Sequence, residues 1–167
     1  VILFFWRDVS LAIHGIPRLL RGKIDTPGSK LAFLLGISTI PVVLAGLILH
    51  ETGLDDAMRS TAVVAWAMII FGAVLYWADQ KEDTSKTDKD WTIKDAIIMG
   101  LWQAVALIPG TSRSGITITG ARHLGYSRGR AARLSMLMSL PPIIASAALL
   151  GLDVINTAAG AAARNGA

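Results

Sequence analysis

Cysteine is absent from the 167 residues, which excludes disulfide bonds and thiol chemistry. Charge is also scarce, because Lys, Arg, Asp and Glu make up 17% of the chain, whereas a soluble domain averages about a quarter. Hydrophobic residues make up 53% of the sequence, and the mean hydropathy is +0.53. This balance excludes an ordinary soluble domain and predicts an all-α integral membrane protein.

The formal net charge is +4, and the basic residues lie in short stretches between apolar runs. That distribution is typical of the cytoplasmic loops of a membrane protein and not of a nucleic-acid-binding face. No nucleic-acid-binding motif occurs in the sequence. We therefore expect a membrane, and no nucleic acid, among the partners.

Three apolar stretches have the length of membrane-spanning helices. Leu31–Leu49 and Ser60–Ala78 each contain nineteen uncharged residues, which as helix cover about 28 Å and suffice to cross the hydrocarbon core. Leu134–Leu152 is the third, with a bend expected at Pro141-Pro142. The sequence thus predicts a multi-span helical bundle.

The regions around these spans are more polar. Residues 1–6 have the character of the end of a membrane helix, and Ser10–Gly22 is expected to form an amphipathic helix on the membrane surface. Asp79–Asp95 carries four lysines and six acidic residues, and we expect a solvated cytoplasmic loop there. The last residues, 153–167, are small and of low complexity, so we expect them to fray and the membrane domain to cover 1–152.

Two further apolar segments, Ile93–Ile108 and Ile116–Leu124, are too short to cross a membrane separately. They flank a loop in which Pro109 cannot continue a helix and Gly110 permits backbone angles that other residues resist. Non-helical backbone at membrane depth is tolerated only inside protein or beside a water-filled cavity. We therefore predict a re-entrant helical hairpin that turns in mid-membrane.

Arg113 carries the one charge between Ala96 and Ala121. An arginine at membrane depth costs about 2.5–3.5 kcal/mol, so it usually faces a polar cavity or a partner. Hydroxyl side chains accompany it at Thr111, Ser112, Ser114, Thr117 and Thr119. A guanidinium forms paired hydrogen bonds with phosphate or carboxylate, and a helix start adds N–H donors. The loop is predicted to bind an anion, and the pattern suits a phosphate better than a carboxylate without deciding between them.

An alternative is that Arg113 anchors the end of an ordinary membrane helix at the interface, as arginines commonly do. The uncharged residues 116–121 argue against it, because they place the arginine inside the apolar window.

The run from Pro109 to Thr117 resembles the P-G-x-S-R-S-x-x-T signature of the undecaprenyl-diphosphate phosphatases. Gln103 before it and Leu124–Arg128 (LGYSR) after it are similar to that family's surroundings. The resemblance implies a multi-pass protein of the bacterial inner membrane. It also implies hydrolysis of undecaprenyl diphosphate to undecaprenyl phosphate and inorganic phosphate, which recycles the lipid carrier of peptidoglycan synthesis. The implied fold has two inverted repeats, each with a re-entrant hairpin, of which this chain supplies the second.

The resemblance also implies roles for the residues of the loop. Arg113 and Ser112 are expected to be catalytic. Substrate-binding positions are expected at Gly110, Thr111, Ser114, Thr117 and Gln103. Gln103 has the alternative role of satisfying a neighbouring helix. The nucleophile stays open between a serine and a metal-activated water.

In this family an E-x-x-x-E pair and a histidine from an N-terminal half accompany the loop, which implies a divalent cation, calcium or magnesium. The present sequence has two glutamates, Glu51 and Glu82, which are 31 positions apart, and its histidines lie outside the family's histidine motif. No metal ligand is therefore expected in this chain. We interpret it as a fragment that lacks the N-terminal part and the C-terminal helices and is incomplete for catalysis alone. Glu51 beside His50 is a weak metal candidate, because two adjacent residues do not build a site.

A function of another class also stays open, namely a transporter or flippase that binds an anionic lipid headgroup without cleaving it. A phosphatase of the P-S-G-H type is disfavoured, because that motif is absent. The expected partners are a polyprenyl diphosphate lipid and the membrane. A homodimer is also compatible with the sequence.

Overall fold

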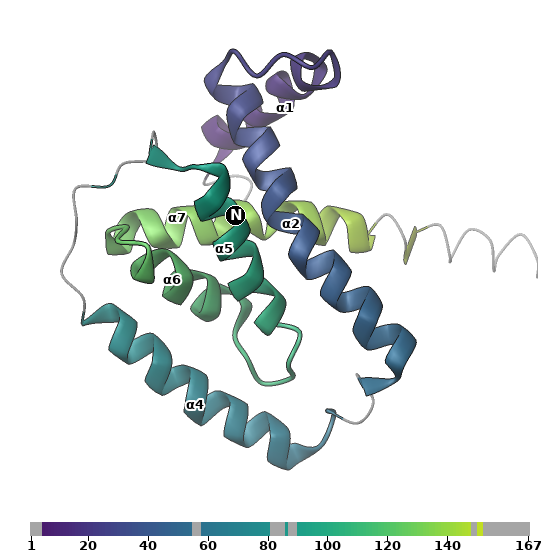
Figure 1. The fold of residues 1–167 in the computed structure, drawn as a ribbon, viewed down its shortest axis with the longest axis vertical. Helices are drawn as coiled ribbons and strands as arrows, with labels where there is room; N and C mark the ends of the chain where they lie inside the picture. The colour runs from purple at the N-terminus through teal and green to yellow at the C-terminus, as the bar shows by residue number, and fades with distance from the viewer. Residues whose placement is uncertain (1–4, 55–57, 81–85, 87–89, 148–149, 152–167) are drawn as a thin grey trace, which may run out of the picture.

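The computed structural model describes residues 5–54, 58–80, 86, 90–147 and 150–151. Within this part of the chain the regular structure is helical, and no strand is formed. The helices, labelled as in Figure 1, are α1 (Trp6–Leu20), α2 (Pro27–Thr52), α4 (Thr61–Asp79), α5 (Ile93–Val105), α6 (Arg113–His123) and α7 (Arg128–Met138).

Hydroxyl side chains determine where four of these helices begin. The residue before each helix accepts a hydrogen bond from a backbone N–H of the first turn, which satisfies a donor that the helix itself leaves free. These N-cap residues are Thr26 for α2, Ser60 for α4, Thr92 for α5 and Ser112 for α6. The predicted apolar runs therefore start as helices at sequence-encoded caps.

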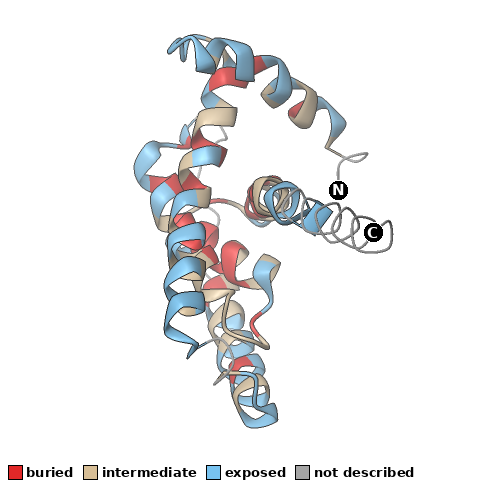
Figure 2. Cartoon of the chain, turned by 90° about the vertical axis from the view of Figure 1, so that its right-hand side faces the viewer, coloured by how far each residue is buried: buried red, intermediate tan, exposed pale blue. Residues whose placement is uncertain are grey.

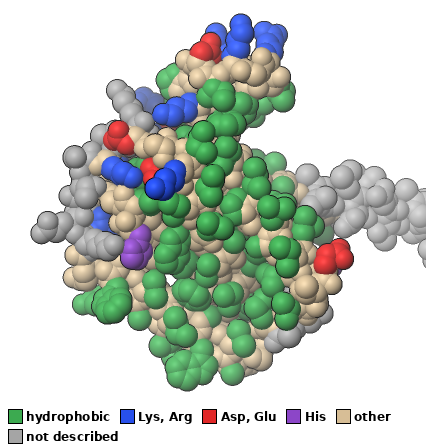
Figure 3. Space-filling model, viewed as in Figure 1, with side chains coloured by type: hydrophobic (Ala, Val, Ile, Leu, Met, Phe, Trp, Pro, Cys, Tyr) green, Lys and Arg blue, Asp and Glu red, His purple; other side chains and the backbone are tan. Residues whose placement is uncertain are grey.

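Helices α2 and α4 are long and apolar enough to cross a membrane, as the two uncharged runs predicted. Much of their apolar surface is exposed, with Trp66, Ile69 and Trp77 on α4 as examples. Figure 3 shows apolar side chains over most of the visible face, while Lys and Arg gather toward the end that carries α1. Exposed apolar surface of this extent marks a surface that contacts lipid or other protein. The fold is that of an all-α membrane protein.

The helices meet around one small core, where α2, α5, α6 and α7 converge. Helix α2 packs on both α1 and α5, and α6 packs on α4, α5 and α7. Figure 2 shows buried residues concentrated at these crossings and exposed residues on the outer faces. At the crossing of α2 and α5, a Cβ on Gly100 would lie 2.4 Å from the backbone oxygen of Ser38. This glycine is what allows the two backbones to come so close.

The amphipathic helix expected over Ser10–Gly22 is confirmed as part of α1. Its large apolar side chains Leu11, Ile13, Ile16 and Leu20 are exposed. The prediction for the opening residues is wrong at Trp6, which begins α1 instead of ending a preceding helix. Residues 1–4 lie outside the described residues, as does the tail 153–167.

The third predicted span, Leu134–Leu152, differs from the structure at its start. Helix α7 begins six residues earlier, at Arg128, and the helical hydrogen bonding lapses at Ser139 before it resumes over 140–147. Ser139 keeps right-handed helical backbone angles, and the Ile143 N–H donates to its carbonyl at 3.3 Å. The lapse therefore reflects the backbone N–H groups that Pro141 and Pro142 lack, and a bend at these prolines stays a prediction.

The expectation of a fully solvated loop over Asp79–Asp95 is wrong at its end. Trp91 is 2% exposed and Asp95 is 4% exposed. The Asp95 carboxylate accepts hydrogen bonds from the Tyr126 hydroxyl at 2.8 Å and from Lys86 Nζ at 3.3 Å. These bonds compensate the carboxylate for its burial. Residues 81–85 and 87–89 of this stretch lie outside the described part.

Candidate functional site

The loop of residues 106–112 joins α5 to α6, which pack side by side, so a helical hairpin is formed. At its tip, Gly110 has φ +92°, a left-handed conformation that disfavours any side chain. A Cβ there would also lie 2.5 Å from the backbone oxygen of Val64 on α4. Gly110 thus seats the loop against α4. The position of this hairpin within a membrane stays a prediction.

Ser112 ends the loop and caps α6. Its Oγ accepts a hydrogen bond from the Gly115 N–H at 3.3 Å and lies 3.3 Å from the Ser114 Oγ. The first N–H groups of a helix have no acceptor within it, so those of Arg113 and Ser114 remain available. This end of the helix also carries the positive end of its dipole. The start of α6 therefore gathers hydroxyl and N–H donors at one place.

Arg113 is exposed in the first turn of α6. Among the described residues its guanidinium makes no hydrogen bond or ion pair, and its backbone carbonyl alone is engaged, as an acceptor from Thr117. Its position beside Ser112 and Ser114 is the grouping that the sequence predicted. The structure therefore places a guanidinium that no other described residue engages beside N–H and hydroxyl donors at the start of α6.

Three other predicted site residues lie behind this surface. Thr117 is 1% exposed, and its hydroxyl faces the Arg113 carbonyl at 2.9 Å and the Ser135 Oγ at 2.6 Å. Thr111 is buried, and no described residue forms a hydrogen bond with its hydroxyl. Gln103 is buried toward α7, where its Nε2 donates to the Met138 carbonyl at 3.5 Å while its Oε1 has no partner. Gln103 thus contacts a neighbouring helix, the alternative role considered for it.

A hollow of about 150 Å³ lies between the start of α6 and α4. Ser112 and Gly115 form one side, and the apolar side chains of Met68, Phe71 and Leu75 form the other. The donors of the loop therefore adjoin an apolar wall on the span. This combination suits a ligand that has an anionic group and a hydrocarbon part.

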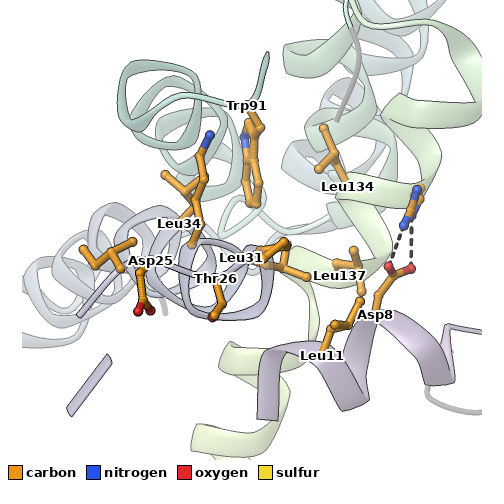
Figure 4. A pocket seen from close by; sticks show the side chains of 13 residues that line it. Asp8, Leu11, Asp25, Thr26, Leu31, Leu34, Trp91, Leu134 and Leu137 are labelled. Carbon is orange, nitrogen blue, oxygen red and sulfur yellow. Dashed lines mark hydrogen bonds and ion pairs between the residues drawn. The ribbon is translucent and has the colours of Figure 1, made fainter. Parts of the chain in front are cut away.

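A larger cavity, of about 470 Å³, lies away from this loop, between α1, the start of α2, Trp91 and α7. Figure 4 shows Leu11, Leu31, Leu134 and Leu137 around it, with Asp8 at its edge. The Asp8 carboxylate there accepts a hydrogen bond from Arg133 Nε at 3.1 Å. None of the predicted site residues lines this cavity, so size alone does not locate the site.

Two arginines that follow the loop in the sequence, Arg122 and Arg128, hold helices together. Arg122 donates to the Tyr126 carbonyl at 2.9 Å and to the Asp79 carbonyl at 3.2 Å. Arg128 binds the Asp79 carboxylate in two places, at 2.7 and 3.0 Å. Sequence reasoning interpreted these arginines as markers of the cytoplasmic side alone. Their shared partner Asp79, the last residue of α4, could not be identified from spacing.

The fit of a divalent cation can be tested on the described residues. They contain no group of three or more His, Cys, Asp or Glu side chains that could hold a metal. The loop offers a guanidinium, N–H groups and hydroxyls, which are donors to an anion more than ligands to a cation. The residues described here do not fit a metal site, and we derive no step through a metal.

The fold and this site define an all-α membrane protein organised around a donor-rich helical hairpin. The sequence matches the model of the family described as "Bacitracin resistance protein BacA" over residues 1–166. The chain belongs to this family.

Curated relatives agree with this assignment. An undecaprenyl-diphosphatase of Jannaschia sp. is 64% identical over 167 residues, and one of Ruegeria pomeroyi is 59% identical over the same length. Both alignments cover 100% of this chain and 62% of the relative. An undecaprenyl-diphosphatase of Chromohalobacter salexigens is 40% identical over 162 residues, which are 97% of this chain and 61% of the relative. The chain thus spans about three fifths of the length of these relatives.

Proposed function

We propose that the protein hydrolyses undecaprenyl diphosphate to undecaprenyl phosphate and inorganic phosphate, and so recycles the lipid carrier of peptidoglycan synthesis. The observation that carries this proposal is the Arg113 guanidinium at the capped start of α6, which is exposed and has no partner within the part of the chain that the structure describes. The names of the relatives support the choice of substrate.

Arg113 and the loop supply what a transferring phosphoryl group requires. Charge spreads over its oxygens in the transition state, and catalysis depends mainly on positioning and electrostatic stabilisation. The Arg113 guanidinium binds two of these oxygens, and the N–H groups at the start of α6 bind others along the favourable helix dipole. Ser112 and Ser114 add hydroxyl donors. Ser112 is the serine candidate for the nucleophile, and an attacking water is the alternative.

The hollow beside α4 supports a lipid substrate more than a free diphosphate. Its apolar side, formed by Met68, Phe71 and Leu75, offers hydrocarbon contact next to the donors of Ser112 and Gly115. In the proposed complex the first prenyl units lie along α4 while the diphosphate lies at α6. Burial of those units contributes binding at about 25 cal/mol per Å² of apolar surface.

The proposed arrangement in the bacterial inner membrane is multi-pass, with α2 and α4 as spans and α5–α6 as a re-entrant hairpin. Arg122 and Arg128 lie at the Asp79 end of α4, which the charge rule assigns to the cytoplasm. The loop lies toward the opposite end, beside Val64. A divalent cation, calcium or magnesium, is part of the proposal, with ligands from outside the described residues.

The test is phosphate release from undecaprenyl diphosphate by the full-length gene product in detergent, with calcium or magnesium supplied. We expect release that is lost on Arg113→Ala while the diphosphate's affinity also falls. Saturable diphosphate binding without release under either metal would instead assign the protein to transport of the lipid. The same assay on the 167-residue chain tests whether residues 1–167 suffice for activity.

A further inference from the structure

A serine outside the predicted signature lies directly behind the loop. Ser135 is on α7 and is 3% exposed. Its Oγ lies 2.6 Å from the Thr117 Oγ1 and 3.3 Å from the Ser114 carbonyl oxygen. Helix α7 thus reaches the first turn of α6 with a single buried hydroxyl.

The two hydroxyls, Ser135 and Thr117, have one proton each, and the geometry limits where these protons go. If Ser135 donates to Thr117, the Thr117 proton goes to the Arg113 carbonyl at 2.9 Å or the Ser114 carbonyl at 3.1 Å. If Thr117 donates to Ser135, the Ser135 proton goes to the Ser114 carbonyl. In both arrangements the pair holds a carbonyl of the first turn, and neither hydroxyl has a proton left for a ligand.

These carbonyls belong to the peptide groups that form the donor surface. A peptide group is planar, so the Arg113 C=O and the Ser114 N–H move as one unit, as do the Ser114 C=O and the Gly115 N–H. The Gly115 N–H is the group that Ser112 Oγ caps. The Ser135–Thr117 pair therefore binds carbonyl oxygens of the same peptide groups whose N–H groups point toward the loop.

We propose that Ser135 is a positioning residue for the reaction, which acts through Thr117 and the Ser114 carbonyl to fix the rotation of the first turn of α6. This inference rests on the proposed function. Fixed peptide planes aim the N–H donors and the Arg113 backbone at one phosphate position, and such preorganisation stabilises the transition state more than the ground state. Ser135 itself contacts no substrate.

The experiment compares Ser135→Ala with Ser38→Ala in the full-length gene product. Ser38 is a matched control, because it is also a buried helical serine, and its hydroxyl donates to a carbonyl of its own helix, Leu35, at 2.9 Å. We expect Ser135→Ala to lower kcat for phosphate release about tenfold with a smaller change in KM, since one net hydrogen bond of the aligned state is lost. Ser38→Ala is expected to leave both constants unchanged. Thermal unfolding midpoints in detergent report whether each variant is folded.

A double-mutant cycle separates positioning from plain stability. Thr117→Val removes the partner hydroxyl at nearly constant shape, and the double variant with Ser135→Ala is expected to be no slower than the slower single variant. Independent, multiplicative losses in the double variant would overturn the coupling. A kcat of Ser135→Ala equal to that of Ser38→Ala would overturn the inference outright.

A binding arm distinguishes this failure from that of the proposed function. The probe is methylene diphosphonate, a diphosphate analogue that is not hydrolysed, titrated into the same variants by calorimetry. If the unsubstituted protein releases no phosphate but Ser135→Ala weakens probe binding several-fold, the proposed function fails, and Ser135 positions the donors of α6 for a bound anion and not for hydrolysis. If the unsubstituted protein neither releases phosphate nor binds the probe, both are overturned.

Discussion

The two arginines of α6 lie in opposite settings. Arg113 in the first turn is exposed and has no partner among the described residues, whereas Arg122 in the last turn is 1% exposed and donates to two carbonyls. The helix dipole favours a cation at the last turn and disfavours one at the first. Arg122 is therefore where the fold by itself prefers an arginine, whereas Arg113 lies where the dipole disfavours a cation and favours a bound anion.

The largest effect on turnover is expected when Arg113, the exposed arginine of the two, is replaced. Arg113→Ala in the full-length gene product should lower kcat for phosphate release about 10²–10³-fold, the usual loss for one transition-state donor. The unfolding midpoint should stay unchanged, because the side chain is exposed and would lose no interaction with the described residues. Arg113→Lys is the matched control, because lysine keeps the charge but loses the paired hydrogen-bond geometry of the guanidinium. Its kcat should lie between those of the unsubstituted protein and Arg113→Ala. Unchanged turnover in Arg113→Ala would remove the site assignment.

The reverse result is expected at Arg122. Arg122→Met should destabilise the protein by about 2 kcal/mol, because two carbonyls lose a charged donor and one of them is buried with Tyr126. Chemical denaturation in detergent measures this change. Turnover per folded molecule should be unaffected, and a loss of turnover at full stability would contradict the separation of the two roles.

The backbone offers a third way to disturb the loop end. Gly110→Ala forces a side chain into φ +92° and against the Val64 carbonyl, and should cost about 1–2 kcal/mol. Gly36→Ala in α2 is the control, since nothing lies within 4 Å of its added Cβ and alanine favours helix. Gly110→Ala should lower both turnover and the unfolding midpoint, whereas Gly36→Ala should lower neither. Equal behaviour of the two variants would show that the loop does not depend on this contact.

The smallest effect is expected at Arg18, which is paired but exposed. Arg18 lies 3.3 Å from Asp25, and both side chains are more than half exposed. Arg18→Ala should change the free energy of unfolding by less than about 0.5 kcal/mol, because water screens such a pair. A larger loss, measured in the same denaturation series as Arg122→Met, would show that pairing without burial also stabilises this fold.

Local features were predictable from the sequence. The two uncharged runs became α2 and α4, and the short apolar segments became the hairpin of α5 and α6, because helix length and Pro-Gly breaks are encoded within a few residues. The grouping of Ser112, Arg113 and Ser114 followed from their adjacency. The start of α7 was missed because the expected span began at the uncharged residue Leu134, whereas the arginine-rich residues before it are also helical, and Ser127 before them is a typical N-cap residue.

Long-range pairs were not predictable in the same way. Asp95 is held by Tyr126, 31 positions away, and Arg133 by Asp8, 125 positions away. Ser135 meets Thr117 across 18 positions and belongs to no signature. A buried carboxylate within a charged stretch looks the same in sequence as a solvated one, because its partners are chosen by the packing of helices.

The contact between Gly110 and Val64 also fixes where the loop tip lies along the length of α4. Val64 is the fourth residue of α4, so with α4 upright in a bilayer the loop tip lies about 5 Å, or one helical turn, from that end of the span. In that orientation the tip would lie nearer one face of the bilayer than its middle, and the depth of the turn stays a prediction. A doubly charged headgroup would then shed little of its hydration to reach Arg113, while its prenyl chain stays in the lipid. If the proposed function holds, the contact between Gly110 and Val64 would place the loop so that a diphosphate headgroup avoids much of the energetic barrier to entering the membrane protein.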